Sequence, residues 1–348
     1  MEKIRLGRTN MMVTRLSLGG IPIQKVPEDE AIAVVRRCLE LGINFIDTAN
    51  AYTNSEERIG KAILGQRDRP ILATKTTSRT GEGVKEHLKL SLKQLGVEYI
   101  DLYQPHNVAD PDALNAILEP NGPMAVIEEA KKAGLVKHIG VTSHSMDMAK
   151  ELVKSDRFET IMFPFNFITC EAATELLPLA REHDVGFIAM KPLAGGRLNK
   201  INITFKYLFQ FPDVVFIPGI AHVQEIEEIA QLLEEPHEIT AADRIEIQRV
   251  RQELGKNFCR RCDYCQPCDE EIPISLVLYI PTHIRHIPPE KLFSGVVANA
   301  MEKAANCTEC GECEERCPYD LSIREMIKEY VHQYQEEKTK YQRQASSS

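Results

Sequence analysis

Short apolar runs alternate with amphipathic stretches along roughly the first two thirds of the chain. The apolar runs have the length and composition of buried strands, and the stretches between them repeat apolar residues at helical spacing. The predicted strands are residues 16–20, 44–48, 71–75, 100–104, 138–142, 160–163, 186–190 and 214–217. The predicted helices are residues 28–41, 55–64, 83–95, 124–133, 146–154, 172–182, 202–211 and 223–233.

Strands that alternate with helices pair in parallel through right-handed crossovers, which places the chain in the α/β class. Eight such units in this length favour a closed (β/α)8 TIM barrel, preceded by a hairpin over residues 3–13. An open dinucleotide-binding sheet would carry a G-x-G-x-x-G turn after a strand, and Gly19-Gly20 does not complete one. We therefore predict a barrel over residues 1–238.

The sequence changes character after the barrel. Residues 239–256 form a polar connecting helix in this interpretation, and residues 257–334 form a small, mostly helical domain that contains eight of the ten cysteines. Residues 335–348 are polar and end in serines, so we predict a disordered tail.

Composition narrows the class of function. The formal net charge of -9 and the lack of a basic cluster argue against nucleic acid as a partner. No apolar run approaches the roughly 18 residues that a membrane span requires, and the first residues lack the apolar core of a signal peptide. The expectation is a cytoplasmic protein with no membrane partner.

Polar side chains gather where the predicted strands end. Asp47 and then Tyr52 follow the second strand, Lys75 ends the third, and His106 follows the fourth. Each has an ordinary explanation as a rim residue or a structural ion pair. In a barrel, however, the carboxyl ends of adjacent strands meet at one face, where the chemistry occurs.

At these residues the sequence resembles the aldo/keto reductase family, over about residues 1 to 235. The motifs that carry the resemblance are Asn44-Phe45-Ile46-Asp47-Thr48-Ala49 with Tyr52, Ser55-Glu56, Ala73-Thr74-Lys75, Leu102-Tyr103-Gln104-Pro105-His106, Ile139-Gly140-Val141-Thr142 and Ile217-Pro218-Gly219. The resemblance implies that Tyr52 is the general acid, that Lys75 and Asp47 lower its pKa, and that His106 orients a small carbonyl substrate. A nearby cation favours the phenolate, which agrees with these roles.

The resemblance also implies a nicotinamide cofactor, NADP(H) or NAD(H), that lies across the strand ends. The residues implied to contact it are Gly20, Thr142, Ser143, Lys191, Leu193, Gly195 and Gly219. The chain departs from the family pattern at Thr142-Ser143, where many members read Ser-Asn, and at Met162, which replaces a common glutamine. The run after Gly219 lacks the Ser, Lys and Arg residues that usually bind a 2′-phosphate.

The cysteines form two runs of four. The runs are Cys259-x2-Cys262-x2-Cys265-x2-Cys268 and Cys307-x2-Cys310-x2-Cys313-x3-Cys317-Pro318. The second run has the spacing of bacterial ferredoxins, so we predict two [4Fe-4S] clusters. Structural zinc bound by four thiolates is the alternative, and spacing does not reveal which cysteine serves which cluster. This region resembles the subgroup of aldo/keto reductases with a C-terminal ferredoxin-type domain.

Two classes of function are consistent with these features. The first is an NAD(P)H-dependent carbonyl reductase whose clusters transfer electrons, and the second is a non-enzymatic redox sensor or electron-transfer subunit that binds nucleotide. The clusters could also serve only to stabilise a small domain. Five glutamates around the second cysteine run predict an acidic face that suits a basic one-electron partner: Glu302, Glu309, Glu312, Glu314 and Glu315.

Overall fold

The computed structural model describes residues 1–66 and 70–346 of the 348-residue chain. The chain divides into two compact units, Met1–Asp243 and Arg244–Ser348, and each is described by itself. Among the helices of the described ranges, none has both the length and the apolar character needed to cross a membrane.

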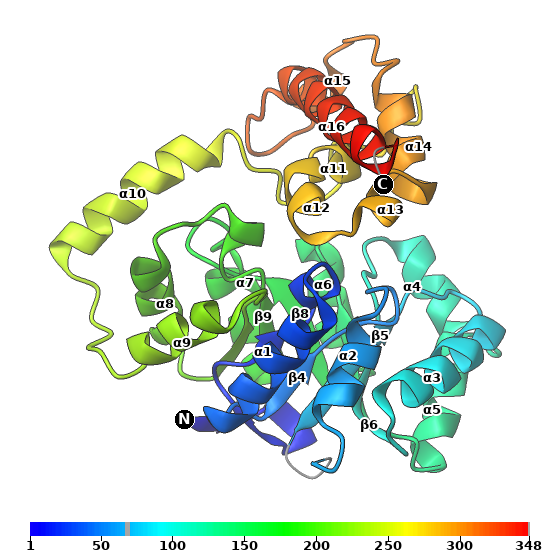
Figure 1. The fold of residues 1–348 in the computed structure, drawn as a ribbon, viewed down its shortest axis with the longest axis vertical. Helices are drawn as coiled ribbons and strands as arrows, with labels where there is room; N and C mark the ends of the chain where they lie inside the picture. The colour runs from blue at the N-terminus through cyan, green and yellow to red at the C-terminus, as the bar shows by residue number, and fades with distance from the viewer. Residues whose placement is uncertain (67–69, 347–348) are drawn as a thin grey trace. The chain divides into compact units, whose positions relative to one another are not determined.

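The first unit is built around eight parallel strands whose order in the sheet follows the sequence (Figure 1). Bridges from Leu16 to Phe216 and from Gly19 to Gly219 join the first strand region to the last and close the sheet. The strands are β3 (Leu18–Gly19), β4 (Phe45–Asp47), β5 (Ile71–Thr76), β6 (Ile100–Pro105), β7 (Val136–Thr142), β8 (Thr160–Pro164), β9 (Gly186–Met190) and β10 (Val214–Ile217). The predicted (β/α)8 barrel is confirmed.

Helices connect the strands around the outside of the barrel. They are α1 (Glu28–Glu40), α2 (Ser55–Ala62), α3 (Gly81–Leu95), α4 (Pro111–Leu118), α5 (Pro123–Lys132), α6 (Met146–Lys154), α7 (Ala172–Glu182), α8 (Ile201–Phe209) and α9 (Val223–Leu232). Helix α4 is the one that the periodicity does not predict, because only Leu114 and Ile117 of its residues are buried. Its start is nevertheless well defined, since the Asp110 side chain accepts a hydrogen bond from the Ala113 amide.

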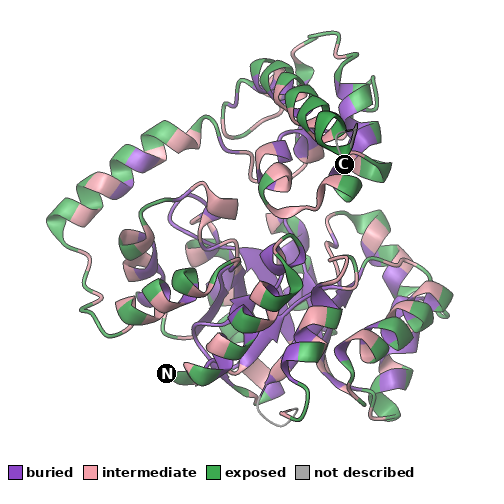
Figure 2. Ribbon diagram, in the orientation of Figure 1, coloured by how far each residue is buried: buried purple, intermediate pink, exposed green. Residues whose placement is uncertain are grey.

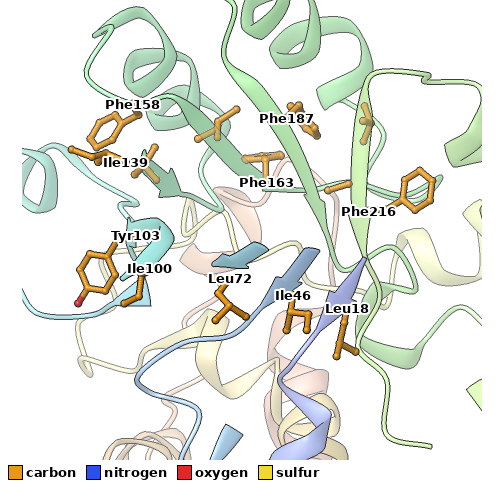
Figure 3. Close-up of a cluster of buried hydrophobic side chains, with 14 of the residues drawn as sticks. Leu18, Ile46, Leu72, Ile100, Tyr103, Ile139, Phe158, Phe163, Phe187 and Phe216 are labelled. Atoms are coloured by element: carbon orange, nitrogen blue, oxygen red, sulfur yellow. The ribbon is translucent and has the colours of Figure 1, made fainter. Parts of the chain in front are cut away.

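Alternation along the strands separates two apolar layers. Ile46, Leu72 and Tyr103 belong to the large cluster between the strands and the helices, part of which is shown in Figure 3. Their neighbours Phe45, Ala73 and Leu102 belong to a second cluster, which fills the barrel interior. Because side chains along a strand alternate between the two faces, the residues two further on, Asp47, Lys75 and Gln104, also point into the barrel.

The opposite end of the barrel is covered by the N-terminal hairpin, β1 (Lys3–Arg5) and β2 (Met12–Thr14), which pair antiparallel. Leu6 and Val13 from this region complete the interior cluster. Gly7 lies against β9 with a positive φ, and a Cβ there would be 2.1 Å from the amide nitrogen of Gly186. Only glycine fits this close approach, so the hairpin is held tightly against the strand starts.

The second unit is helical. Its elements are the remainder of α10 (Ala241–Gly255), α11 (Ile274–Val277), α12 (Ile280–His286), α13 (Pro289–Leu292), α14 (Gly295–Ala304), α15 (Glu312–Glu315) and α16 (Ile323–Ser346). Its own apolar core includes Val277, Ile280, Met301, Ile327 and Tyr330. Figure 2 shows buried positions on several of these helices, with exposed residues along much of α10 and α16.

The predicted disordered tail is wrong as far as residue 346, because helix α16 continues to Ser346. Apolar contacts explain the extension: the Tyr341 ring lies 5.3 Å from that of Phe293, centroid to centroid, and Tyr334 is buried. Lys340 also pairs with Glu337 at 2.6 Å, which supports the helix locally. The last two residues of the predicted tail lie outside the described residues.

Candidate active site and cysteine pockets

Asp47 and Lys75 form a buried ion pair inside the barrel, at the carboxyl ends of β4 and β5. The Lys75 Nζ donates to Asp47 Oδ2 at 2.5 Å and to the Thr48 carbonyl at 2.6 Å. Gln104 Nε2 donates to the other Asp47 oxygen at 3.4 Å. Both charged side chains are at most 4% exposed. Sequence reasoning and structure agree on the location of this pair.

Tyr52 and His106 lie beside the ion pair. The Lys75 Nζ is 5.2 Å from the centre of the Tyr52 ring, and the rings of Tyr52 and His106 meet edge to face at 6.0 Å. Burial lowers the pKa of Lys75, but the Asp47 carboxylate and the Tyr52 hydroxyl outweigh burial, so the pKa is raised overall and Lys75 stays an ammonium. Neither Tyr52 nor His106 is fully buried. The buried ion pair and the two partly exposed rings therefore lie together, and Tyr52 and His106 are the members that solvent can reach.

Hydrogen bonds within the protein hold the loop that carries His106. The Arg79 guanidinium donates to the carbonyl oxygens of His106 and Asn107, at 2.7 and 2.9 Å. The Asn107 amide donates to Thr142 Oγ1 at 2.7 Å, and the Asn107 side chain contacts His144 Nδ1 at 2.7 Å. Three loops at the mouth of the barrel are thus tied together.

The sequence prediction did not include Arg79, Asn107 or His144. His144 also contacts Lys191 Nζ through its other ring nitrogen, at 2.9 Å. Its position directly after the predicted Thr142-Ser143 pair was the available signal. Arg79 had no comparable signal, because it stands in a loop after β5 with no motif around it.

The residues that the resemblance implied for cofactor binding divide into three groups. Gly20 and Gly219 lie at the strand ends. A Cβ on Gly20 would lie 2.9 Å from the backbone carbonyl oxygen of Asp47, and a Cβ on Gly219 would lie 2.8 Å from the Pro22 ring. The hydroxyls of Thr142 and Ser143 are buried and hydrogen-bonded within the protein.

The other three implied residues share the loop after β9. Lys191, Ala194, Gly195 and Gly196 all have positive φ there, and Leu193 lies between them. Successive backbone amides in such a conformation can surround an anion.

Carboxylates occupy the start of helix α9. The Glu225 Oε2 accepts hydrogen bonds from the amides of Ala221 and His222, at 2.7 and 3.1 Å. His222 Nδ1 is hydrogen-bonded to Glu30, which raises the pKa of His222. The amides of the two residues that precede helix α9 are therefore already bonded to an acidic side chain.

Two pockets in the second unit are each lined by four cysteines. Cys259, Cys262, Cys265 and Cys317 line the first, which we call the inner pocket. Cys268, Cys307, Cys310 and Cys313 line the second, which we call the outer pocket. Each pocket thus takes three cysteines from one run and one from the other.

The thiols fit a metal-bound role chemically. Burial raises the pKa of Cys259 to about 11 and that of Cys313 to about 11. A buried thiolate is therefore unfavourable unless a cation neutralises it, and iron in a cluster does so. The donor set of four thiolates in each pocket matches the ligation of a [4Fe-4S] cluster.

The predicted acidic face needs correction. Three of its glutamates form ion pairs: Glu309 with Lys328 at 2.6 Å, Glu312 with Arg316 at 3.1 Å and Glu314 with Arg324 at 2.7 Å. Arg316 is only four residues after Glu312, but the sequence does not show that α16 brings Arg324 and Lys328 against Glu314 and Glu309. The local excess of negative charge is therefore much smaller than predicted.

Family models match both units of the chain. Residues 15–242 match the model described as the aldo/keto reductase family, and residues 258–322 match a 4Fe-4S dicluster domain.

Curated relatives have similar descriptions. An uncharacterized oxidoreductase of Bacillus subtilis, YqkF, is 32% identical over 58% of this chain and 67% of its own length. The aldo-keto reductase YhdN of the same organism is 32% identical over 62% of this chain and 68% of its own length. An NADH-specific methylglyoxal reductase of Escherichia coli is 29% identical over 57% of this chain and 69% of its own length.

Solved structures share the barrel. The holo form of aldo-keto reductase AKR11C1 from Bacillus halodurans aligns with a TM-score of 0.61 at 26% identity, over 72% of this chain and 96% of that one. An aldo-keto reductase from Klebsiella pneumoniae in complex with NADPH aligns with a TM-score of 0.59 at 21% identity, over 72% and 95%. At that identity the second likeness concerns the fold alone.

Proposed function

Because the chain belongs to the aldo/keto reductase family, we propose that it is an NAD(P)H-dependent reductase of a small carbonyl compound, with two [4Fe-4S] clusters in its C-terminal unit. One observation supports the reaction above all others: the Lys75 ammonium, held by Asp47, lies beside the ring of a half-buried tyrosine. A non-enzymatic nucleotide sensor would not require a proton donor in that place.

The proposed chemistry divides between cofactor and chain. A reduced nicotinamide, when bound, supplies the hydride to the carbonyl carbon. The chain supplies the proton: Tyr52 Oη donates it to the carbonyl oxygen, and the Lys75 ammonium stabilises the phenolate that remains. Asp47 fixes the ammonium, and His106, whose ring meets the edge of Tyr52, orients the carbonyl oxygen.

The cofactor is held, in this proposal, at the strand ends around Gly20 and Gly219 and at the loop after β9. Glu30 and Glu225 lie near the loop where the family resemblance places a 2′-phosphate. His222 offsets part of the charge of Glu30, and the negative charge that remains would repel the phosphate. We therefore expect NAD(H) to be preferred over NADP(H). One of the relatives is itself described as NADH-specific.

The two cysteine-lined pockets support an assignment of the cluster ligands. We assign Cys259, Cys262, Cys265 and Cys317 to one cluster and the other four cysteines of the two runs to the second. This exchange of one cysteine between the runs is the arrangement of two-cluster ferredoxins. We propose that the clusters pass electrons one at a time, as cubane clusters do.

Replacing Tyr52 by Phe tests the reaction. The variant keeps the ring and loses the proton donor, so turnover of carbonyl substrates should fall on the order of 10²-fold or more while nucleotide still binds. The measurement is stopped-flow oxidation of NADH and NADPH with a panel of aldehydes and ketones.

The matched control is Tyr99→Phe. Tyr99 contacts Lys137, whose Nζ lies 4.6 Å from the ring centre, away from the ion pair of Asp47 and Lys75. This variant should turn over normally. Normal turnover in Tyr52→Phe would overturn the proposed role of Tyr52.

A further inference from the structure

Cys310 differs from the other seven cysteines of the two pockets. It is exposed, whereas the others are buried or half-buried. Six of the seven belong to the apolar core of the second unit or pack against it, and Cys310 does not. Its neighbours Thr308 and Glu309 are exposed as well. One edge of the outer pocket therefore reaches solvent.

The inner pocket is more sheltered. Leu278, Leu321, Ile323 and Tyr319 line it together with its four cysteines, and none of these apolar side chains is exposed. The Arg260 guanidinium lies 3.7 Å from the centre of the Tyr319 ring. A partner protein would therefore approach a cluster in the outer pocket more closely than one in the inner pocket.

The surface around Cys310 carries charges of both signs. The three ion pairs of Glu309, Glu312 and Glu314 lie around the outer pocket, and Arg316 and Arg324 line it. Two further acids, Asp269 and Glu270, line the same pocket. The five acids outnumber the three bases by two, so the surface carries both signs, and long-range electrostatic steering should be weaker than five unpaired acids would give.

We propose that electrons enter and leave the C-terminal unit at the surface around Cys310, and that the partner is a one-electron carrier protein whose contact face carries charges of both signs. The inference rests on the proposed cluster content. The four cysteines of the outer pocket would hold a cluster that, when reduced to [4Fe-4S]¹⁺, would supply one electron to the oxidised carrier and return to [4Fe-4S]²⁺, with no bond broken and no proton moved. Complexes of this kind are small, with less than about 1,200 Å² buried.

The test uses two small oxidants of opposite charge, ferricyanide and tris(phenanthroline)cobalt(III). Holoprotein is first analysed for iron and sulfide, so that a failure of the cluster proposal is recognised separately. Dithionite-reduced protein is then mixed anaerobically with each oxidant, and the visible absorbance of the clusters gives two rate constants. Their ratio reports the local charge where electrons leave.

Lys328→Glu provides the perturbation and Lys340→Glu the matched control. Both lysines are on the exposed side of α16, both pair with a glutamate at 2.6 Å, and they are 60% and 64% exposed. Only Lys328 pairs with Glu309 beside Cys310. Asp263→Asn, next to Cys262, alters the charge at the inner pocket instead.

Lys328→Glu should raise the cobalt-to-ferricyanide ratio by about tenfold at low ionic strength, and high salt should remove the effect. Lys340→Glu and Asp263→Asn should leave the ratio within about twofold of the original protein. The proposed exit of electrons near Cys310 would be overturned by an unchanged ratio in Lys328→Glu. It would also be overturned if either of the other two variants changed the ratio as much as Lys328→Glu does. The same reduced protein is also mixed with cytochrome c, a uniformly basic carrier. If the rate of electron transfer to cytochrome c falls steeply as the salt concentration rises, the proposal of a mixed-charge contact face is overturned.

Discussion

Glu159 anchors the end of the barrel opposite the candidate active site, so its replacement should reduce stability and leave catalysis intact. Its two carboxylate oxygens contact Lys131 Nζ and His138 Nδ1, each at 2.7 Å. The Ile139 amide also donates to it at 2.9 Å. The residue therefore connects α5 and β7 to the start of β8.

The expected loss of unfolding free energy follows from the pKa of Glu159. Burial raises this pKa, but the hydrogen bonds from His138, Lys131 and the Ile139 amide outweigh burial and lower it from 4.5 to about 2. At about 1.4 kcal/mol per pKa unit, the ionised carboxylate contributes about 3.5 kcal/mol at neutral pH before solvent screening is considered. Because the Lys131 side chain is 39% exposed and partly screened by water, we expect about 2 kcal/mol.

The pH dependence has a definite sign. A lowered folded-state pKa means that the contribution is complete above the unfolded value of about 4.5 and is lost as the pH falls towards about 2. The difference in stability between the original protein and Glu159→Gln should therefore be constant near neutral pH and should shrink below about pH 4.5.

The assay is anaerobic urea unfolding followed by far-UV circular dichroism, with carbonyl turnover measured on the same samples. The control is Glu175→Gln. Glu175 pairs with Lys150 at the surface, so this substitution should lower the free energy of unfolding by less than about 0.5 kcal/mol. This role of Glu159 is refuted if Glu159→Gln lowers the free energy of unfolding no more than the control does, or if the difference between the original protein and Glu159→Gln grows as the pH falls below about 4.5.

Three other outcomes follow from the site and the pockets. Asp47→Asn leaves the Lys75 ammonium buried without a counter-charge, so unfolding should become easier by about 3 to 5 kcal/mol; a thermal shift no larger than that of an exposed ion-pair variant would contradict this. Glu30→Gln removes a carboxylate beside the expected 2′-phosphate position, so the ratio of KM for NADPH to KM for NADH should fall about threefold or more in steady-state assays; an unchanged ratio would mean that the phosphate binds elsewhere. Anaerobically prepared protein should contain about eight iron atoms and as much sulfide; about two zinc atoms without iron would contradict the cluster proposal.

The sequence by itself determined the barrel, through its periodicity, and it placed the four candidate active-site residues at the strand ends, while the family resemblance supplied their proposed roles. Alternation along β4 and β5 places Asp47 above Phe45 and Lys75 above Ala73, inside the barrel, and parallel pairing brings the strand ends to one face. Tyr52 and His106 follow within a few residues of those strand ends, so short loops are enough to bring them to the same place.

Only the tertiary structure decided which distant groups meet. The spacing within the two cysteine runs does not show that Cys268 lies with Cys307 and Cys317 with Cys259, since the grouping depends on how the helical unit folds back on itself. The same folding brings Lys328 against Glu309, which turns a predicted acidic face into one of mixed charge. Contacts between segments far apart in the chain are selected by packing, and no local pattern encodes them.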